Sequence, residues 1–116
     1  MRRGDIYLVN FGKSRDTFAF GKIRPALIIQ TDKLNFAVEE GLYDYFLVVP
    51  LSTQDDVLTD EFRVKIEARE GLEKDSFAVV SSICFLHKQY LLKKLTSLND
   101  DEMQQIEQIL KETFDL

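Results

Sequence analysis

Several strand-length apolar segments follow one another along this chain, with no alternating helices predicted between them. The five clearest segments are residues 5–11, 25–30, 43–51, 62–68 and 76–86. A pair of parallel strands needs a crossover of about 10–12 residues or more, usually through a helix. The sequence therefore predicts a mostly antiparallel sheet, strongly bent or rolled into a small barrel.

The pattern within each segment predicts its place in the sheet. Segments 5–11 and 43–51 are apolar on both faces, which is typical of central strands. Segment 62–68 alternates apolar with charged residues, so one of its faces should meet solvent. Segment 76–86 is the longest predicted strand. Segment 88–95 is ambiguous between a helical turn and a last short strand.

Residues 99–114 carry the clearest helical pattern. Asn99 can cap this helix, with Glu102 three residues later as the second half of a capping box. One apolar stripe is formed by Met103, Ile106, Ile109, Leu110 and Phe114. We therefore expect an amphipathic C-terminal helix with a single buried face.

Bulk composition limits the classes of protein that this chain can belong to. A length of 116 residues with 45% hydrophobic content is typical of one globular domain, predicted to span 1–116. Neither a membrane-spanning segment nor a secretory signal is recognisable, so we expect a cytoplasmic protein. One cysteine, Cys84, and one histidine, His87, exclude an intramolecular disulfide and an all-protein zinc site. No metal or cofactor is predicted.

Charge is distributed unevenly along the chain. The net charge is −5, but residues 1–33 hold seven basic and three acidic residues and carry +4. The remaining residues carry −9. Such asymmetry indicates an anionic partner at one surface. The alternative is that these basic residues are simply solvated.

Arg24 is the first candidate for chemistry. It precedes Pro25, which disfavours helical geometry at Arg24 and fixes the direction in which its side chain leaves the chain. A guanidinium keeps its charge and presents a planar fork that fits phosphate oxygens. Arg24 could therefore stabilise a reacting phosphate. The alternative is a surface ion pair with Asp5 or Asp32.

Hydroxyl groups follow the segment that ends at Leu51. Ser52 or Thr53 would emerge at the same end of the sheet as Arg24 if the two strands are neighbours. A hydroxyl there can donate a hydrogen bond to a phosphate oxygen, although many such groups only complete a turn. No base is placed near Ser52 by the sequence, so a serine nucleophile is unsupported.

The segment between Gly12 and Gly21 combines aromatic and basic side chains. Phe18 and Phe20 are interleaved with basic residues, which are Lys13, Arg15 and Lys22. Stacking platforms beside cations are typical of surfaces that bind single-stranded nucleic acid. The alternative is that both rings pack this loop onto the core.

Four stretches of the chain, taken in order and spacing, resemble the MazF/PemK family of toxins from bacterial toxin–antitoxin pairs. These stretches are "RRGDIYLVNF", "GKIRPALIIQTDKLN", "VVPLSTQ" and "GLEKDSFAVVSSICFLHKQYLLKKLTSLNDDEMQQIEQIL". The resemblance implies an α+β, mainly β fold: a small SH3-like, CcdB/PemK-like antiparallel barrel with a C-terminal helix. It also implies a homodimer and a cognate antitoxin, with which the toxin binds DNA as a complex.

The same resemblance implies an activity. Members of this family are metal-independent endoribonucleases that cut single-stranded RNA at short motifs by attack of the substrate's own 2′-OH, leaving a cyclic phosphate and a 5′-OH. By the resemblance Arg24 serves in proton transfer and in stabilising the phosphorane, and Ser52 supports it. The residues that would bind RNA are Arg15, Phe18, Phe20, Lys22, Thr53 and Gln54.

Two positions depart from the family pattern. Family members often carry an acidic residue where Ser81 stands and an arginine where Cys84 stands. The loss of both charges favours an alternative reading, a non-catalytic CcdB/PemK-like protein that binds gyrase, RNA or an antitoxin. Arg24 and the motif around it favour the nuclease.

Overall fold

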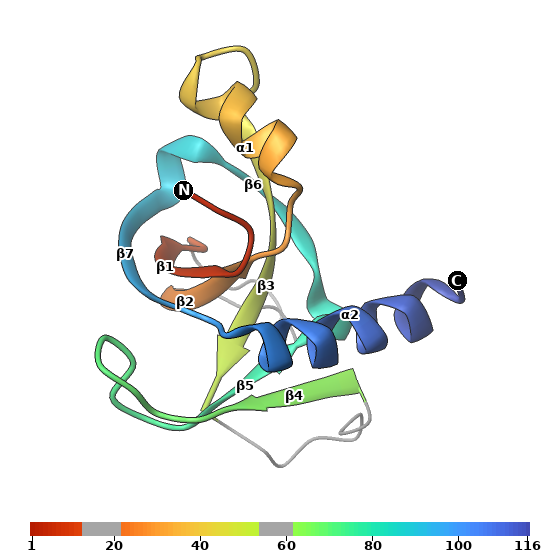
Figure 1. The fold of residues 1–116 in the computed structure, drawn as a ribbon. Coiled ribbons are helices and arrows are strands. Elements are labelled where there is room, and N and C mark those ends of the chain that lie inside the picture. The colour runs from red at the N-terminus through yellow and green to blue at the C-terminus, as the bar shows by residue number, and fades with distance from the viewer. Residues whose placement is uncertain (13–21, 54–61) are drawn as a thin grey trace.

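The computed structural model describes residues 1–12, 22–53 and 62–116 (Figure 1). Its strands are β1 (Asp5–Asn10), β2 (Ile23–Ile28), β3 (Tyr45–Ser52), β4 (Arg63–Ile66), β5 (Ser76–Val79), β6 (Cys84–His87) and β7 (Leu91–Ser97). The helices are α1 (Asp32–Glu39) and α2 (Asp100–Phe114), with 3₁₀ turns η2 (Val80–Ser82) and η3 (Lys88–Tyr90). The predicted α+β, mainly β class is confirmed.

The seven strands form one antiparallel sheet. Their order is β4-β5-β3-β2-β1-β7. Strand β6 lies outside this order and pairs with the first half of β3, whereas β5 pairs with its end. The sheet is not closed into the predicted barrel, because within the described ranges β4 pairs only with β5 and β7 only with β1. The connection between β4 and β5 nevertheless lies against β7, where Arg69 Nη1 donates a hydrogen bond to the Ser97 carbonyl oxygen at 3.3 Å.

The prediction of one long strand over 76–86 is wrong. The structure divides this segment into β5 and β6, which pair with successive parts of β3. Leu51 pairs with Ala78 and Val48 with Cys84, so an advance of three residues along β3 corresponds to an advance of six along this segment. The three extra residues form η2. Apolar periodicity does not reveal such an insertion, because Val80 in η2 is as buried as a strand residue.

Helix α1 was not predicted from the sequence. Only Asn35 and Val38 of its eight residues are buried, so it lacks a long apolar stripe. A buried amide network holds it instead: Gln30 Nε2 donates to Asn35 Oδ1 at 3.2 Å, and Asn35 Nδ2 donates to the Gln30 carbonyl at 3.0 Å. The ambiguous segment 88–95 contains both a helical turn, η3, and the start of β7.

The two faces of the sheet bury two separate cores. The helix-side core is covered by α2 and includes Leu27, Val49, Leu51, Ala78 and Ile106. The α1-side core lies on the other face and includes Val9, Ala26, Ile28, Val38 and Val48. Alternate residues of β2 and β3 therefore point to opposite cores, as strand geometry requires. This alternation fixes the face on which each residue of the site lies.

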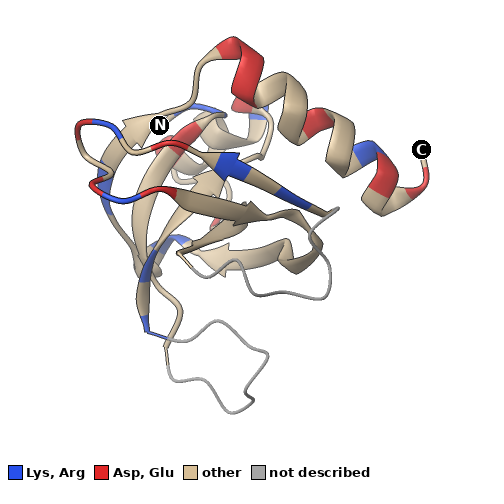
Figure 2. Cartoon of the chain, turned by 90° about the horizontal axis from the view of Figure 1, so that it is seen from below, with Lys and Arg blue, Asp and Glu red and all other residues tan. Residues whose placement is uncertain are grey.

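The C-terminal helix follows the prediction at its start and departs from it at its end. Asn99 and Glu102 form the expected capping box. Ile106 is fully buried, with Met103, Ile109 and Leu110 packed around it. Phe114 is 54% exposed, so its predicted place in the buried stripe is wrong for this chain. Acidic positions recur along the length of α2 (Figure 2).

Candidate functional site

Arg24 is the second residue of β2 and lies half-buried opposite Val9 of β1. The two carboxylates considered as its surface partners have other contacts. Asp5 accepts a hydrogen bond from Ser97 Oγ at 2.8 Å, and Asp32 accepts one from the backbone N–H of Arg3 at 2.6 Å. The N–H of Arg3, with the amide of Asn35, holds the pKa of Asp32 below its usual value. The carboxylates of Asp5 and Asp32 therefore stabilise the N-terminal turn and its contact with the start of α1.

Ser52 is the last residue of β3 and is 6% exposed. Strands β2 and β3 are neighbours, as the sequence prediction required, and their last registered pair here is Ala26 with Pro50. Continuing this antiparallel register by two residues sets Arg24 opposite Ser52. Residues directly opposite each other in an antiparallel pair have their side chains on the same face, with Cβ atoms about 4.5–5.5 Å apart.

The face that carries Arg24 and Ser52 is the one opposite α2. Ala26 and Val9, which flank Arg24 along and across the strands, belong to the α1-side core. Leu51, which precedes Ser52, belongs to the helix-side core. Strand alternation therefore places both Arg24 and Ser52 on the sheet face that the C-terminal helix leaves uncovered.

The remaining predicted RNA-binding residues lie in or beside two connections. Lys22 and Thr53 are exposed and immediately precede β2 and follow β3. Lys22 has a φ of 67°, an unusual backbone conformation for a side chain with a Cβ. Its N–H donates to the Gly12 carbonyl at 2.5 Å. Arg15, Phe18, Phe20 and Gln54 lie outside the described residues.

The polar residues in and just after segment 76–86, which was predicted as one strand, lie in different elements of the structure. Ser81 is exposed and Ser82 half-buried, both in η2. Cys84 in β6 packs against the α1-side core, and burial raises the pKa of its thiol. His87 has a structural role: its Nδ1 accepts from the Gln89 N–H at 3.1 Å, and its ring meets the edge of Tyr45 at 5.3 Å between centroids.

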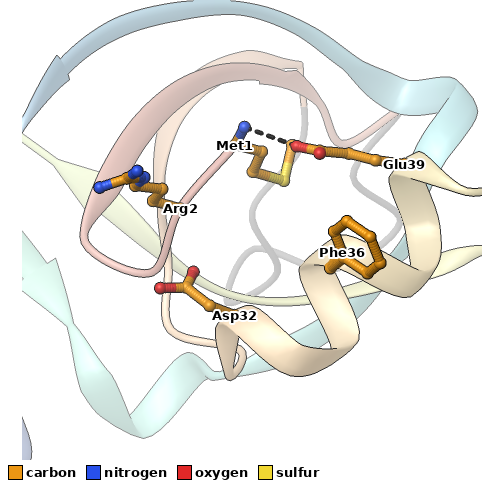
Figure 3. A pocket seen from close by; sticks show the side chains of 5 residues that line it. All are labelled: Met1, Arg2, Asp32, Phe36 and Glu39. Atoms are coloured by element: carbon orange, nitrogen blue, oxygen red, sulfur yellow. Dashed lines mark hydrogen bonds and ion pairs between the residues drawn. The ribbon is translucent and has the colours of Figure 1, made fainter.

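A cavity of about 390 Å³ lies away from Arg24 and Ser52. It is lined by Met1, Arg2, Asp32, Phe36 and Glu39, as Figure 3 shows. The terminal ammonium of Met1 pairs with Glu39 at 2.8 Å across it. None of the residues predicted for the site lines this cavity. No cluster of His, Cys, Asp or Glu able to hold a metal ion occurs among the described residues.

Strands β4 and β5 bring further residues next to the predicted pair. Ser52 is registered with Phe77 of β5, and Phe77 with Lys65 of β4. Neither residue was predicted for the site, and Lys65 lies in the segment for which the sequence predicts one solvated face. Only the pairing register could reveal them. Together, the Arg24 guanidinium and the Ser52 hydroxyl on the face opposite α2 can hold a phosphate group, and Lys65 adds a cation farther along the same face.

Comparison with known proteins identifies the family to which this chain belongs. A model of the family described as the PemK-like, MazF-like toxin of type II toxin–antitoxin systems matches residues 2–114. The chain belongs to this family. The resemblance inferred from its motifs is therefore confirmed, and the chain is a MazF-like toxin of a toxin–antitoxin system. The alternative of a CcdB-like binding protein is not favoured.

Solved structures share the fold of this family member at low sequence identity. The Mycobacterium tuberculosis toxin MazF-mt6 is 19% identical, with a TM-score of 0.73 and 97% of each chain covered. A mycobacterial endoribonuclease in complex with its cognate antitoxin is 19% identical, with a TM-score of 0.75 over 100% of this chain and 96% of that one. Deinococcus radiodurans MazF is 16% identical, with a TM-score of 0.75 over 100% and 97%. These likenesses show the fold.

Two of the motifs that carry the resemblance form hydrogen bonds that stabilise the fold of this chain. In "RRGD", the Asp5 carboxylate accepts from the Arg2 N–H at 2.9 Å and from Ser97 Oγ, which fixes the entry into β1 beside β7. In "IIQTDKLN", the buried amides of Gln30 and Asn35 join α1 to β3, where Gln30 Oε1 accepts from the Leu47 N–H at 3.1 Å. The contacts of these motifs therefore stabilise the fold.

Within the described residues, no helix is long and apolar enough to cross a membrane.

Proposed function

We propose that this chain is an endoribonuclease that cuts single-stranded RNA at short motifs without a metal ion, with Arg24 and Ser52 at the reacting phosphate. The observation that supports the proposal is the pairing of β2 with β3, whose register, continued by two residues beyond Ala26 and Pro50, would set Arg24 opposite Ser52 on one sheet face. That face is opposite α2. Membership of a toxin family known for endoribonuclease activity supports the same conclusion.

The reaction is an internal transesterification of the RNA backbone. The 2′ oxygen forms a bond to the adjacent phosphorus as its proton passes to a water molecule, and the bond from phosphorus to the 5′ oxygen breaks. The 5′ oxygen takes up a proton from water, so the products are a cyclic phosphate and a 5′-OH. Negative charge on the phosphoryl oxygens grows in the transition state, and a preorganised guanidinium stabilises it there.

Arg24 and Ser52 have distinct parts in this scheme. The main contribution of Arg24 is to stabilise the negative charge of the phosphate and to orient it, because its planar guanidinium fork fits phosphate oxygens. The Ser52 hydroxyl, held at the end of a strand, donates a hydrogen bond to a phosphoryl oxygen. Lys22 and Thr53, with Arg15, Phe18, Phe20 and Gln54, would bind the rest of the RNA.

The proposed partners follow from the family and from the exposed apolar surface. A cognate antitoxin would cover the RNA-binding face; structures of relatives from mycobacteria and Deinococcus radiodurans contain such a partner. The complex with antitoxin would bind DNA. A second copy of the chain, folded as one domain over 1–116, would form a homodimer. Phe85 on β6, which is 67% exposed, is a surface that this copy could cover.

The test is a cleavage assay on a long single-stranded RNA in EDTA. The wild-type protein should produce fragments with cyclic phosphate and 5′-OH ends. Arg24→Ala should lower the cleavage rate about 100- to 1000-fold, the usual effect of losing one transition-state donor. The cleavage rate of Arg24→Lys should lie between those of the wild type and Arg24→Ala, because lysine keeps the positive charge but lacks the planar guanidinium.

Lys93→Ala is the matched control, since Lys93 is an exposed cation on β7 that is registered with Leu8 and therefore leaves the sheet on the face opposite to Arg24, which is registered with Val9. It should cut like the wild type. RNA left intact by the wild type, or cut equally by Arg24→Ala, would contradict the proposal. Intact RNA with retained binding would favour a binding protein.

A further inference from the structure

We propose that the RNA-binding surface extends from Arg24 and Ser52 across β5 onto β4, with Phe77 stacking on a base and Lys65 binding a phosphate. This inference rests on the proposed ribonuclease function and names two further substrate-binding residues for it. The four residues Arg24, Ser52, Phe77 and Lys65 are called the cross-strand row below.

The pairing register produces the cross-strand row. Ser52 is paired with Phe77, and Phe77 with Lys65, in two antiparallel ladders. Arg24 stands opposite Ser52 when the β2–β3 register is continued by two residues. Directly opposite residues share a face, so all four side chains leave the same side of the sheet.

Burial of the neighbouring residues confirms that face independently. Ala78 is fully buried and Val64 is 5% exposed, and both belong to the helix-side core. Phe77 and Lys65 alternate with them along β5 and β4. The side chains of Phe77 and Lys65 therefore point away from α2. Phe77 is half-buried and Lys65 is exposed, so both present surface to a ligand. Arg63 also lies on this face, two residues before Lys65.

The spacing of the row suits a strand of RNA longer than one nucleotide. Neighbouring strands are about 4.8 Å apart, so Lys65 stands three strands and about 14 Å from Arg24 along the row. It is therefore too far to contact the reacting phosphate held by Arg24, and it would meet a different phosphate. An aromatic ring between two cations is the arrangement that binds single-stranded nucleic acid without strict sequence preference.

Among the residues that the structure describes, Lys65 has one weak ion pair that would compete with a phosphate. Its ammonium lies 3.8 Å from Asp75 Oδ2, and both side chains are more than half exposed, at 57% and 55%. Solvent-exposed pairs of this kind contribute little free energy. Asp75 has a separate structural contact, because its Oδ1 accepts from the Ala68 N–H at 2.7 Å. A phosphate can therefore displace this carboxylate from Lys65.

The experiment measures RNA affinity and cleavage for variants of the full chain. Binding of a single-stranded RNA of about 12 nucleotides is measured in the cleavage-deficient Arg24→Ala background at several salt concentrations. Lys65→Ala should weaken binding about fivefold and reduce the slope of log K against log salt by about 0.7, the value for one phosphate contact on a single strand. Phe77→Leu should weaken binding about tenfold with an unchanged slope.

Two variants distinguish binding from a structural role. Asp75→Asn keeps an oxygen that can accept from the Ala68 N–H and removes the charge beside Lys65, so binding should become tighter, about twofold. Lys93→Ala removes a cation from β7 and should change neither affinity nor slope beyond the general effect of net charge. In cleavage assays with Arg24 restored, Lys65→Ala should raise KM and leave kcat unchanged.

The outcomes separate this inference from the proposed function. If the wild type cuts RNA in an Arg24-dependent way but Lys65→Ala and Phe77→Leu bind and cut like the wild type, the cross-strand row is not a binding surface. If Lys65→Ala and Lys93→Ala have equal effects, the contribution of Lys65 is only its charge. If the wild type does not cut RNA, the proposed function fails first, and tight, Lys65-dependent binding would still support the surface.

Discussion

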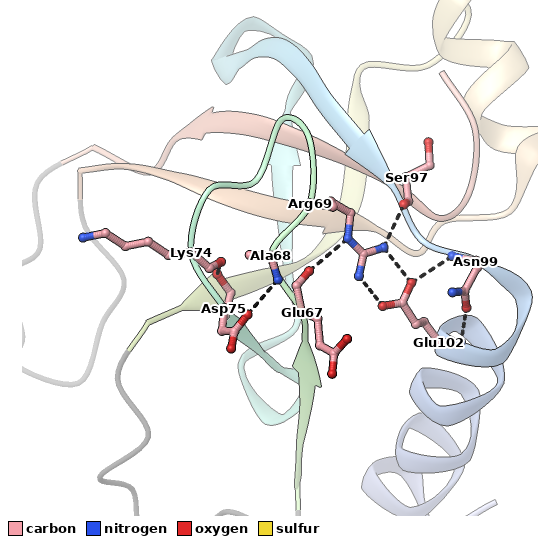
Figure 4. Close-up of polar contacts among 9 residues, drawn as sticks. Glu67, Ala68, Arg69, Lys74, Asp75, Ser97, Asn99 and Glu102 are labelled. Atoms are coloured by element: carbon pink, nitrogen blue, oxygen red, sulfur yellow. Dashed lines mark hydrogen bonds and ion pairs between the residues drawn. The ribbon is translucent and has the colours of Figure 1, made fainter.

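Arg69 and Glu102 form a two-pronged ion pair that joins the β4–β5 connection to the first turn of α2 (Figure 4). Arg69 Nη1 donates to Glu102 Oε1 at 2.7 Å, and Nη2 donates to Oε2. Glu102 Oε1 also accepts from the Asn99 N–H at 2.9 Å, so one carboxylate serves both the ion pair and the helix cap. This contact fastens α2 to the sheet beside Ser97 of β7.

Glu102→Gln should lower the free energy of unfolding at pH 7 by about 2 kcal/mol, because it removes charge-assisted hydrogen bonds from a largely buried site. The side chain of Glu102 is 13% exposed. Glu112→Gln, at an exposed position of the same helix, is the control and should be close to neutral. Urea unfolding measures both. Equal stability of the two variants would show that the pair contributes nothing.

The same pair predicts a dependence of stability on pH. The hydrogen bonds from Arg69 lower the pKa of Glu102 in the folded chain. A lowered carboxyl pKa stabilises the fold above the unfolded value of about 4.3, and this contribution disappears as pH falls through the folded pKa. The wild-type Tm should therefore drop below pH 4.3 more steeply than that of Glu102→Gln. Parallel curves for the two proteins would contradict this assignment.

Gly71→Ala should destabilise the chain by about 3 kcal/mol or more. Gly71 has a φ of 90°, and a Cβ there would overlap the Leu95 carbonyl oxygen of β7. Gly41 is a matched control, since its φ is 76° and a Cβ there would meet nothing within 4 Å. Gly41→Ala should cost only the backbone term, about 1–2 kcal/mol. Equal losses in urea unfolding would mean that the close approach to β7 is unimportant.

Replacing Lys22 separates backbone strain from charge. Its φ of 67° costs about 1 kcal/mol for a residue with a Cβ, and glycine adopts it freely. Lys22→Gly should therefore be about 1 kcal/mol more stable than Lys22→Ala. Both variants lack the cation and should lose RNA affinity to a similar extent. If the two variants differ in RNA-binding free energy by as much as they differ in free energy of unfolding, the backbone conformation at residue 22, and not its charge, determines binding.

Ser52→Ala and Ser52→Thr test whether a hydroxyl is needed at the end of β3. Removing the donor should lower the RNA cleavage rate about 100-fold, whereas threonine keeps the hydroxyl and should retain most of the rate. Ser81→Ala, at an exposed position in η2, should cut like the wild type. Circular dichroism and Tm establish that each variant is folded. Full activity of Ser52→Ala would remove Ser52 from the proposed mechanism.

Much of this fold could be predicted from local patterns. The central strands β1 and β3, the half-solvated β4 and the capped helix α2 each depend on residues close together in the chain, so periodicity and capping chemistry identify them. Helix α1 and the break at η2 could not be found in this way. Both depend on contacts with β3: Gln30 links Asn35 of α1 to the Tyr45 carbonyl, and the two halves of the divided strand pair with successive parts of β3.

The antiparallel class, the family and the candidacy of Arg24 could be predicted from local patterns, because Pro25 and the apolar run after it are neighbours along the chain. The residues that share a face with Arg24 became evident only from the pairing of distant strands. Ser52, Phe77 and Lys65 come from three strands separated by long connections, and only their pairing register brings them into one row. Register is set by hydrogen bonds and core packing between strands, so a single strand's sequence does not contain it.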